Sequence, residues 1–167
     1  MAKDQELTHE EKLEKVKAMM KDIKIGSLTT IAERGLVSRP MAMQETEFDG
    51  DLWFLTFRDT PKIKEITADP RVNVSFSDDD ENYVSISGRA EVLEDPEKKK
   101  DLWNKAFETI FNTEYDDPNL VLIKVHAHGA EYWESGSKVK AAYQFVANLV
   151  GDKEHDLGKN ESVNLDQ

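Results

Sequence analysis

Apolar and polar residues alternate over much of this chain, which is the pattern of strands with one buried face. The clearest example is residues 71–77, where Val72, Val74 and Phe76 fall on one side and polar residues on the other. Similar stretches, or short runs rich in β-branched and aromatic residues, predict further strands at 27–32, 37–44, 52–57, 83–93, 120–126 and 130–133. Short turns separate most neighbours, so hairpins predominate.

Three positions mark where these strands turn or bend. Asp49-Gly50 is typical of a tight hairpin turn. Pro40 cannot donate to a sheet ladder, so it predicts an edge position or a bulge in its strand. Gly88 lies inside a long predicted strand and predicts a bulge where the sheet curls.

Helical periodicity is confined to short segments. Thr8 followed by Glu11 forms a capping box, and apolar residues then recur at steps of three and four, which predicts an amphipathic helix over residues 8–24. Three more segments are predicted: a helix from Pro61 to about residue 68, a helix from Pro96 that packs through Leu102, Trp103 and Phe107, and a helical or irregular stretch at 138–150.

Strands joined in hairpins, with a few short helices, predict one mainly β domain. We expect a small antiparallel barrel of six or seven strands with flanking short α-helices. Residues 1–150 form this domain in our interpretation, and the polar residues 151–167 form a flexible acidic tail.

The composition narrows the classes of function. A net charge of −12 repels phosphate backbones, so we expect no nucleic-acid partner. No apolar run approaches the ~20 residues of a membrane span, and the N-terminus lacks a signal-peptide core, so a cytoplasmic protein is expected. The absence of cysteine excludes disulfides, thiolate metal sites and a cysteine nucleophile.

Residues 38–63 carry the chemistry that this acidic chain otherwise lacks. Arg39 lies on one predicted strand, and Arg58 and Lys62 flank the start of the next helix. Thr60 adds a hydroxyl at that helix N-terminus, where backbone N–H groups favour an anion. The aromatic pair Trp53-Phe54 lies between these cations, with one ring facing the core and the other free to line a pocket. The combination predicts a flat aromatic ligand with a phosphate.

Several short motifs, in this order, resemble the general stress protein 26 group of the pyridoxamine 5′-phosphate oxidase-like superfamily. The resemblance runs from about Leu13 to Trp133. It rests on Ser38-Arg39-Pro40-Met41, Leu52-Trp53-Phe54-Leu55-Thr56, Pro61-Lys62 with Glu65-Ile66, the segment 69–76, the segment 84–90, and Glu131-Tyr132-Trp133.

That resemblance implies a split β-barrel that forms a homodimer and binds FMN at the subunit interface, with FAD or riboflavin bound more weakly. It implies that two strands border the flavin, that Lys62 approaches the phosphate, and that Trp133 of a partner subunit comes near the ring. The expected cofactor-binding residues are Arg39, Pro40, Met41, Trp53, Phe54, Leu55, Thr56, Thr60, Lys62 and Trp133.

The expected function is therefore an FMN-binding general stress protein, acting as a flavin-dependent oxidoreductase or as a flavin sensor or store. No residue stands out as a general acid or base. A pyridoxamine 5′-phosphate oxidase remains an alternative, although the Arg-Leu-x-Pro ending of those enzymes is replaced by Asn164-Leu165-Asp166-Gln167. A second alternative is a non-catalytic barrel that binds a deazaflavin, a haem or a partner protein.

Two histidines invite a metal interpretation. His126 and His128 are two residues apart, on one face of a continuing strand, but the spacing offers no third ligand. The acidic block 78–81 lacks the spaced ligands of a calcium loop and is expected to be a solvated turn. We therefore expect no metal site.

Overall fold

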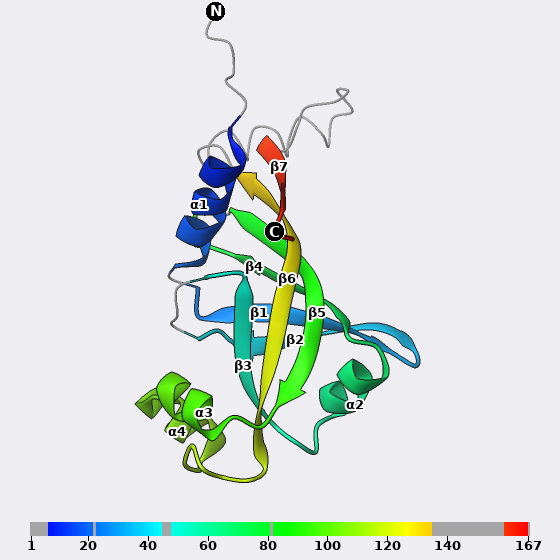
Figure 1. Cartoon of the computed structure of the whole chain (residues 1–167), viewed down its shortest axis with the longest axis vertical. Helices are drawn as coiled ribbons and strands as arrows, with labels where there is room; N and C mark the ends of the chain where they lie inside the picture. The colour runs from blue at the N-terminus through cyan, green and yellow to red at the C-terminus, as the bar shows by residue number, and fades with distance from the viewer. Residues whose placement is uncertain (1–6, 22, 45–47, 81, 135–158, 167) are drawn as a thin grey trace, which may run out of the picture.

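The computed structural model of the protein describes residues 7–21, 23–44, 48–80, 82–134 and 159–166. The fold is mainly β, as predicted (Figure 1). Its helices are α1 (His9–Met20), α2 (Pro61–Ala68), α3 (Pro96–Leu102) and α4 (Lys105–Phe111). Its strands are β1 (Ile25–Ala32), β2 (Gly35–Ala42), β3 (Asp51–Phe57), β4 (Arg71–Ser77), β5 (Tyr83–Leu93), β6 (Leu120–Glu134) and β7 (Lys159–Asn164).

All seven strands belong to one antiparallel sheet. The order is β2-β1-β4-β5-β6-β3, and β7 adds to β6 beyond the end of β3. The sheet curls until its two outer strands, β2 and β3, touch without forming a ladder. This is the split barrel that the resemblance implied.

Two apolar clusters hold the barrel and its helices together. The inner one fills the barrel and includes Phe54, with Val16 and Met20 of α1. The outer one lies under α3 and α4 and includes Leu55. Neighbouring residues of β3 thus serve opposite clusters, which explains why its sequence is an almost unbroken apolar run instead of an alternation.

The long strand β6 differs from the prediction of two strands at 120–126 and 130–133. It is one strand of 15 residues that continues through His128 and Gly129. Gly88 pairs with Ala127 but Ser87 pairs with Gly129, so the register with β5 shifts there and His128 is the extra residue between the two pairs. The bulge predicted from Gly88 is therefore confirmed, and it allows pairing to continue on both sides of the irregularity.

The helix predicted from Pro96 is divided into α3 and α4. The division falls at Trp103 and Asn104, where the chain is extended. The Asn104 side chain accepts hydrogen bonds from the backbone N–H groups of Ala106 and Phe107, so it caps a new helix instead of continuing the old one. Trp103 and Phe107 nevertheless pack inward, as predicted.

The two ends of the chain also depart from expectation. The capping box of Thr8 and Glu11 is formed, but α1 ends at Met20, short of residue 24. Lys159–Asn164 form strand β7, where a flexible tail was predicted. The strand is held because Val163 is buried and Glu161 pairs with Lys12 of α1 at 2.9 Å. Residues 138–150 and 151–158 lie outside the described residues.

No helix within the described ranges is long and apolar enough to cross a membrane.

Gly88 gives a direct test of the bulge. A Cβ at this position would lie 2.3 Å from the backbone oxygen of His126, which is closer than real Cβ contacts. We expect Gly88→Ala to lower the free energy of unfolding by about 3 kcal/mol, because backbone atoms of β6 must move to accommodate it. Urea denaturation measures the change. The control is Gly129→Ala, whose Cβ would lie 3.4 Å from the Val163 oxygen; an equal loss in both variants would contradict this account of the bulge.

Candidate functional site

The predicted phosphate-binding residues gather where β3 leads into α2. Thr60 occupies the N-cap position of α2 without a side-chain capping hydrogen bond, and its hydroxyl donates to the Phe57 carbonyl instead. Pro61 begins the helix, and Lys62 follows in its first turn. The Lys62 ammonium donates a hydrogen bond of 2.9 Å to the hydroxyl of Thr56, a buried residue of β3. The hydroxyls of Thr56 and Thr60 are 3.5 Å apart. Three of the predicted residues are thus brought together around one amino group.

Lys62 is a half-buried cation with a shifted pKa. Its pKa is lowered, first by burial away from water and then by the positive charge of Arg39, while Glu65 acts in the opposite direction. Among the described residues, no carboxylate lies within ion-pair distance of the Lys62 ammonium. A cation in this state gains stability when an anion arrives.

Arg39 lies beside Lys62 but already has an anionic partner. Its guanidinium donates to Glu65 of α2 at 2.7 Å and to the Thr30 hydroxyl at 2.7 Å. Thr30 in turn donates to the same Glu65 oxygen at 2.5 Å. The Arg39 and Glu65 side chains are only 18% and 16% exposed, so this is a partly desolvated network. Arg39 therefore places a positive charge near Lys62, although two of its guanidinium nitrogens are already hydrogen-bonded to Thr30 and Glu65.

Sequence reasoning missed Thr30 and Glu65 as members of this network. Glu65 follows Lys62 by three residues, which places both side chains on the same side of α2 and offered a usable signal. Thr30 lies on β1, and only the pairing of β1 with β2 brings it near Arg39. Arg58, considered as a third cation, instead pairs with Glu94 and donates to the Pro118 carbonyl.

The two predicted aromatic neighbours do lie on opposite sides of β3. Phe54 is fully buried in the inner cluster. Trp53 packs against the outer cluster, and its ring lies between two ammonium groups, 4.6 Å from that of Lys98 and 5.4 Å from that of Lys124. Leu55 is buried on the same side as Trp53. In one subunit, these side chains serve mainly as packing.

The predicted β2 residues divide in the same way. Met41 is buried in the inner cluster, whereas Pro40 is exposed on the outside of the barrel. Pro40 lines a hollow of about 380 Å³ together with Arg39 and Tyr83. The remaining lining residues are Ile25, Gly26, Ser27, Ser38, Ser75, Phe76 and Ser77.

Trp133 lies far from Lys62 along the sheet. It pairs in register with Tyr83 at the start of β5, and the two rings are 5.5 Å apart. Helix α2 packs near the other end, where Pro70 accepts a hydrogen bond from the Ala90 N–H. Seven strand residues separate Tyr83 from Ala90, which corresponds to roughly 20 Å. One subunit therefore does not bring Trp133 to the Lys62 cluster.

A larger cavity, of about 750 Å³, opens between α1 and the start of β3. Its lining includes Met20, Met43 and Leu52, together with Lys17 of α1 and the predicted flavin-binding residue Trp53. None of the predicted phosphate residues contributes to it. The volume is therefore separate from the Lys62 cluster.

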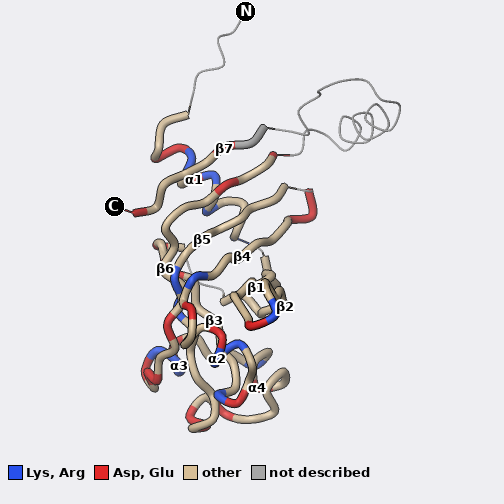
Figure 2. Tube along the Cα trace, turned by 90° about the vertical axis from the view of Figure 1, so that its right-hand side faces the viewer, with Lys and Arg blue, Asp and Glu red and all other residues tan. Residues whose placement is uncertain are grey.

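Charge is unevenly distributed over the molecule. The strands β4 and β5 carry few charges, whereas acidic residues gather at the turn that joins them (Figure 2). In that turn the Asp78 carboxylate accepts hydrogen bonds from the N–H groups of Asp80 and Asn82. This matches the solvated turn expected from the sequence.

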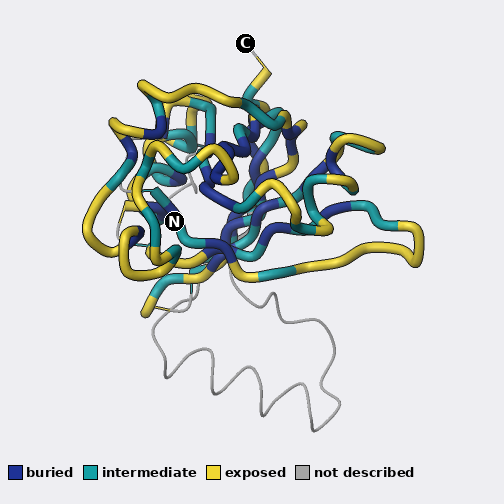
Figure 3. Tube along the Cα trace, turned by 90° about the horizontal axis from the view of Figure 1, so that it is seen from below, coloured by how far each residue is buried: buried dark blue, intermediate teal, exposed yellow. Residues whose placement is uncertain are grey.

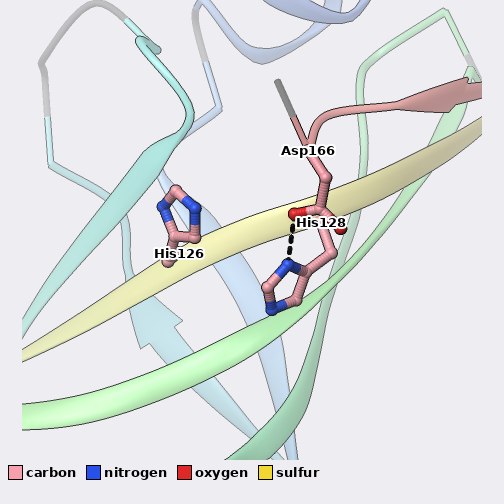
Figure 4. Close-up of side chains that lie close together, drawn as sticks. All are labelled: His126, His128 and Asp166. Carbon is pink, nitrogen blue, oxygen red and sulfur yellow. Dashed lines mark hydrogen bonds and ion pairs between the residues drawn. The ribbon is translucent and has the colours of Figure 1, made fainter.

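The two histidines of β6 have a neighbour that the sequence did not reveal. His126 and His128 lie near Asp166, which follows β7, and the three side chains offer ligand atoms within 4.8 Å of one another (Figure 4). The missing third ligand was the reason for expecting no metal site. It becomes visible only when β7 pairs with β6, because 38 residues separate Asp166 from His128.

Comparison with known proteins agrees with this fold. The family described as pyridoxamine 5′-phosphate oxidase like matches residues 11–156. General stress protein 26 of Bacillus subtilis (strain 168) is 28% identical over 137 residues, covering 78% of this chain and 94% of that protein.

Solved structures give the same relationship. General stress protein 26 from Bacillus anthracis has a TM-score of 0.64 at 29% identity, covering 71% of this chain and 91% of that one. The general stress FMN/FAD binding protein from Xanthomonas citri has a TM-score of 0.67 at 30% identity, covering 78% and 93%. The chain therefore belongs to the pyridoxamine 5′-phosphate oxidase-like family, with relatives among the general stress proteins 26.

Proposed function

We propose that this protein binds FMN and anchors the FMN phosphate at Lys62. The observation that carries the proposal is a half-buried ammonium that has a lowered pKa and, within the described ranges, no carboxylate partner. A phosphate group would supply the missing negative charge. The Thr56 hydroxyl, which accepts the Lys62 hydrogen bond, could donate to a phosphate oxygen, whereas the Thr60 hydroxyl now donates to the Phe57 carbonyl and would have to turn to do so. The relative from Xanthomonas citri is named an FMN/FAD binding protein, which supports the choice of a flavin.

Arg39 adds long-range attraction to this anchor and orients the neighbouring groups. Its ion pair with Glu65 holds the guanidinium beside Lys62. Because Glu65 offsets much of that charge, Lys62 is the main cation for a phosphate. The residues present thus fit one phosphate group.

The flavin ring is proposed to lie against β2 and β3, with backbone groups and Pro40 as contacts and Trp133 supplied by a partner subunit. The separation of Trp133 from the Lys62 cluster along β5 and β6 supports the proposal that Trp133 comes from a partner subunit. Bound FMN would supply hydride or electron transfer, and the protein would supply binding and orientation. The proposed role is a flavin-dependent oxidoreductase or a flavin sensor or store.

Substitution of Lys62 tests the proposal. We expect Lys62→Ala to weaken FMN binding by roughly tenfold or more and to leave riboflavin binding nearly unchanged, because only FMN carries the phosphate. Quenching of flavin fluorescence measures both affinities. The visible spectrum of the FMN-loaded protein should show flavin absorption in the blue and no intense haem band.

Lys64→Ala is the matched control, since Lys64 lies on the same helix but is exposed. It removes the same charge and should change neither affinity by more than about twofold. Equal weakening of FMN and riboflavin by Lys62→Ala would show that Lys62 does not contact the phosphate. Failure of the unmodified protein to bind FMN would contradict the proposal altogether.

We also expect a homodimer. The β1–β2 hairpin projects from the barrel and presents an exposed outer strand (Figure 3). Leu36 is 75% exposed there, and Ile25 on the neighbouring strand is 64% exposed. A second subunit packed on this hairpin would cover these side chains, which lie at its two ends. Light scattering at micromolar concentration with FMN present should report twice the chain mass of 19.1 kDa; a stable monomer would remove the two-subunit site.

Little or no oxidation of pyridoxamine 5′-phosphate is expected. That substrate brings a second phosphate, yet Arg39 and Arg58 are already paired with Glu65 and Glu94. The given sequence has no arginine after Arg89. A buried dianion without partners costs several kcal/mol of binding free energy. Steady-state assays of FMN-loaded protein under air, following both peroxide and pyridoxal phosphate, should stay far below ~1 s⁻¹; faster turnover would favour the vitamin B6 oxidase alternative.

A further inference from the structure

We propose that His126, His128 and Asp166 form a binding site for a divalent transition metal ion, with Zn²⁺ as the reference ion. The site lies on the outer face of β6, where the C-terminal strand β7 joins it (Figure 4). It is separate from the proposed flavin site and does not depend on it.

Strand alternation places His126 and His128, two residues apart, on the same face, and the β5–β6 bulge falls at His128. His128 has no partner on β5, since the register passes from Ala127 to Gly129. The pattern of buried residues also changes there, from Val125 and Ala127 to Ala130 and Tyr132. The bulge therefore changes the alternation only for the residues after His128, and bulges are common beside functional sites.

The Nδ1 atom of each histidine lies within hydrogen-bond distance of a carboxylate oxygen. His126 Nδ1 lies 2.9 Å from an oxygen of Asp51, the residue directly opposite on β3. Metal-binding histidines commonly hold a carboxylate in this manner, which fixes the ring and makes the other nitrogen a better ligand. The Nε2 atom of His126 is thus left for the ion, and the His126 side chain is 59% exposed to solvent.

His128 and Asp166 supply the other two ligands. His128 Nδ1 and Asp166 Oδ1 are joined by a hydrogen bond of 2.5 Å. When a metal ion takes the place of the hydrogen between them, the neutral imidazole keeps its one N–H on Nε2, and the Nδ1 and Oδ1 atoms separate to about 3.4 Å around the ion. The three side chains already offer one ligand atom each within 4.8 Å of one another, so side-chain rotations can complete the set.

Imidazole nitrogens with one carboxylate oxygen suit Zn²⁺, Ni²⁺ or Cu²⁺ better than Mg²⁺ or Ca²⁺. Two features make the site moderate in affinity. Lys124 pairs with Asp51 at 3.3 Å and places a positive charge nearby. His128 Nε2 is buried without a hydrogen-bond partner, so moving the ring proton there is unfavourable. We therefore expect micromolar binding of one ion per chain.

The experiment is a calorimetric titration of the full chain, without flavin, with ZnCl₂. The expected result is one Zn²⁺ per chain at micromolar affinity. His126→Ala and Asp166→Asn should each weaken binding at least tenfold. His9→Ala is the control, because His9 lies on α1 away from the site, and it should bind as the unmodified protein does.

Circular dichroism establishes that the variants are folded, and the exposed position of His126 makes its replacement easy to tolerate. Zn²⁺ should also raise the melting temperature of the unmodified protein but not that of His126→Ala, because an ion that bridges β6 and the end of β7 stabilises only the folded state. Absence of binding by the unmodified protein, or equal binding by the His126 and His9 variants, would overturn the proposal.

Discussion

The close approach of β5 and β6 at Gly88 is the constraint on which the rest of the structure depends. β6 pairs with β5 along its length, with β3 on its first half and with β7 on its second half. A sheet that continued without a bulge could not curl around the inner cluster and still keep these pairings. Because Gly88 has no Cβ, the backbone of His126 can lie against it, and the long ribbon bends there. The pairing of β6 with β5 on both sides of the bulge depends on that one contact.

In the charged network at the other end of the sheet, Arg39 has a carboxylate partner and Lys62 has none among the described residues. Arg39 and Lys62 lie close enough for Arg39 to lower the Lys62 pKa, yet the available carboxylate, Glu65, is bonded to Arg39. Arginine retains its charge in such surroundings, whereas a buried lysine is shifted more readily. The arrangement therefore leaves the lysine as the group that responds to an incoming anion. This asymmetry could not be inferred from two basic residues in a motif.

Local patterns predicted the elements well where local forces decide them. The strands 71–77 and 83–93 have their predicted bounds, because alternation along a half-buried strand is a strong signal. The capping box of α1 and the proline start of α2 were equally local. The break between α3 and α4 was missed, although Asn104 carried the signal of a helix cap.

Long-range features were the ones that sequence reasoning could not supply. β6 was predicted as two strands, and only its pairing with both β5 and β7 shows that it continues through Gly129. The same cause hid the role of Asp166, since nothing near it in the sequence indicates a neighbour on β6. Predicted site residues were brought together where one turn joins them, as with Thr56, Thr60 and Lys62. Residues that meet only through strand pairing, such as Thr30 and Arg39, could be recognised as neighbours only from the folded structure.

Strand β7 covers the second half of β6 and brings Asp166 beside the two histidines of that strand. Without β7, the second half of β6 would have an unpaired edge, and Tyr132 and Ala130 would lose the cover of Val163. Unpaired edges attract other chains, so covering this one leaves the exposed β1–β2 hairpin as the more open apolar surface. The hydrogen bond between His128 and Asp166 holds the residue that follows β7 against β6. The ion pair between Lys12 and Glu161 holds β7 against α1. A cation bound by His126, His128 and Asp166 would therefore stabilise the pairing of β7 with β6. The Lys62 cluster lies at the opposite end of β5 and β6 and remains available for a phosphate.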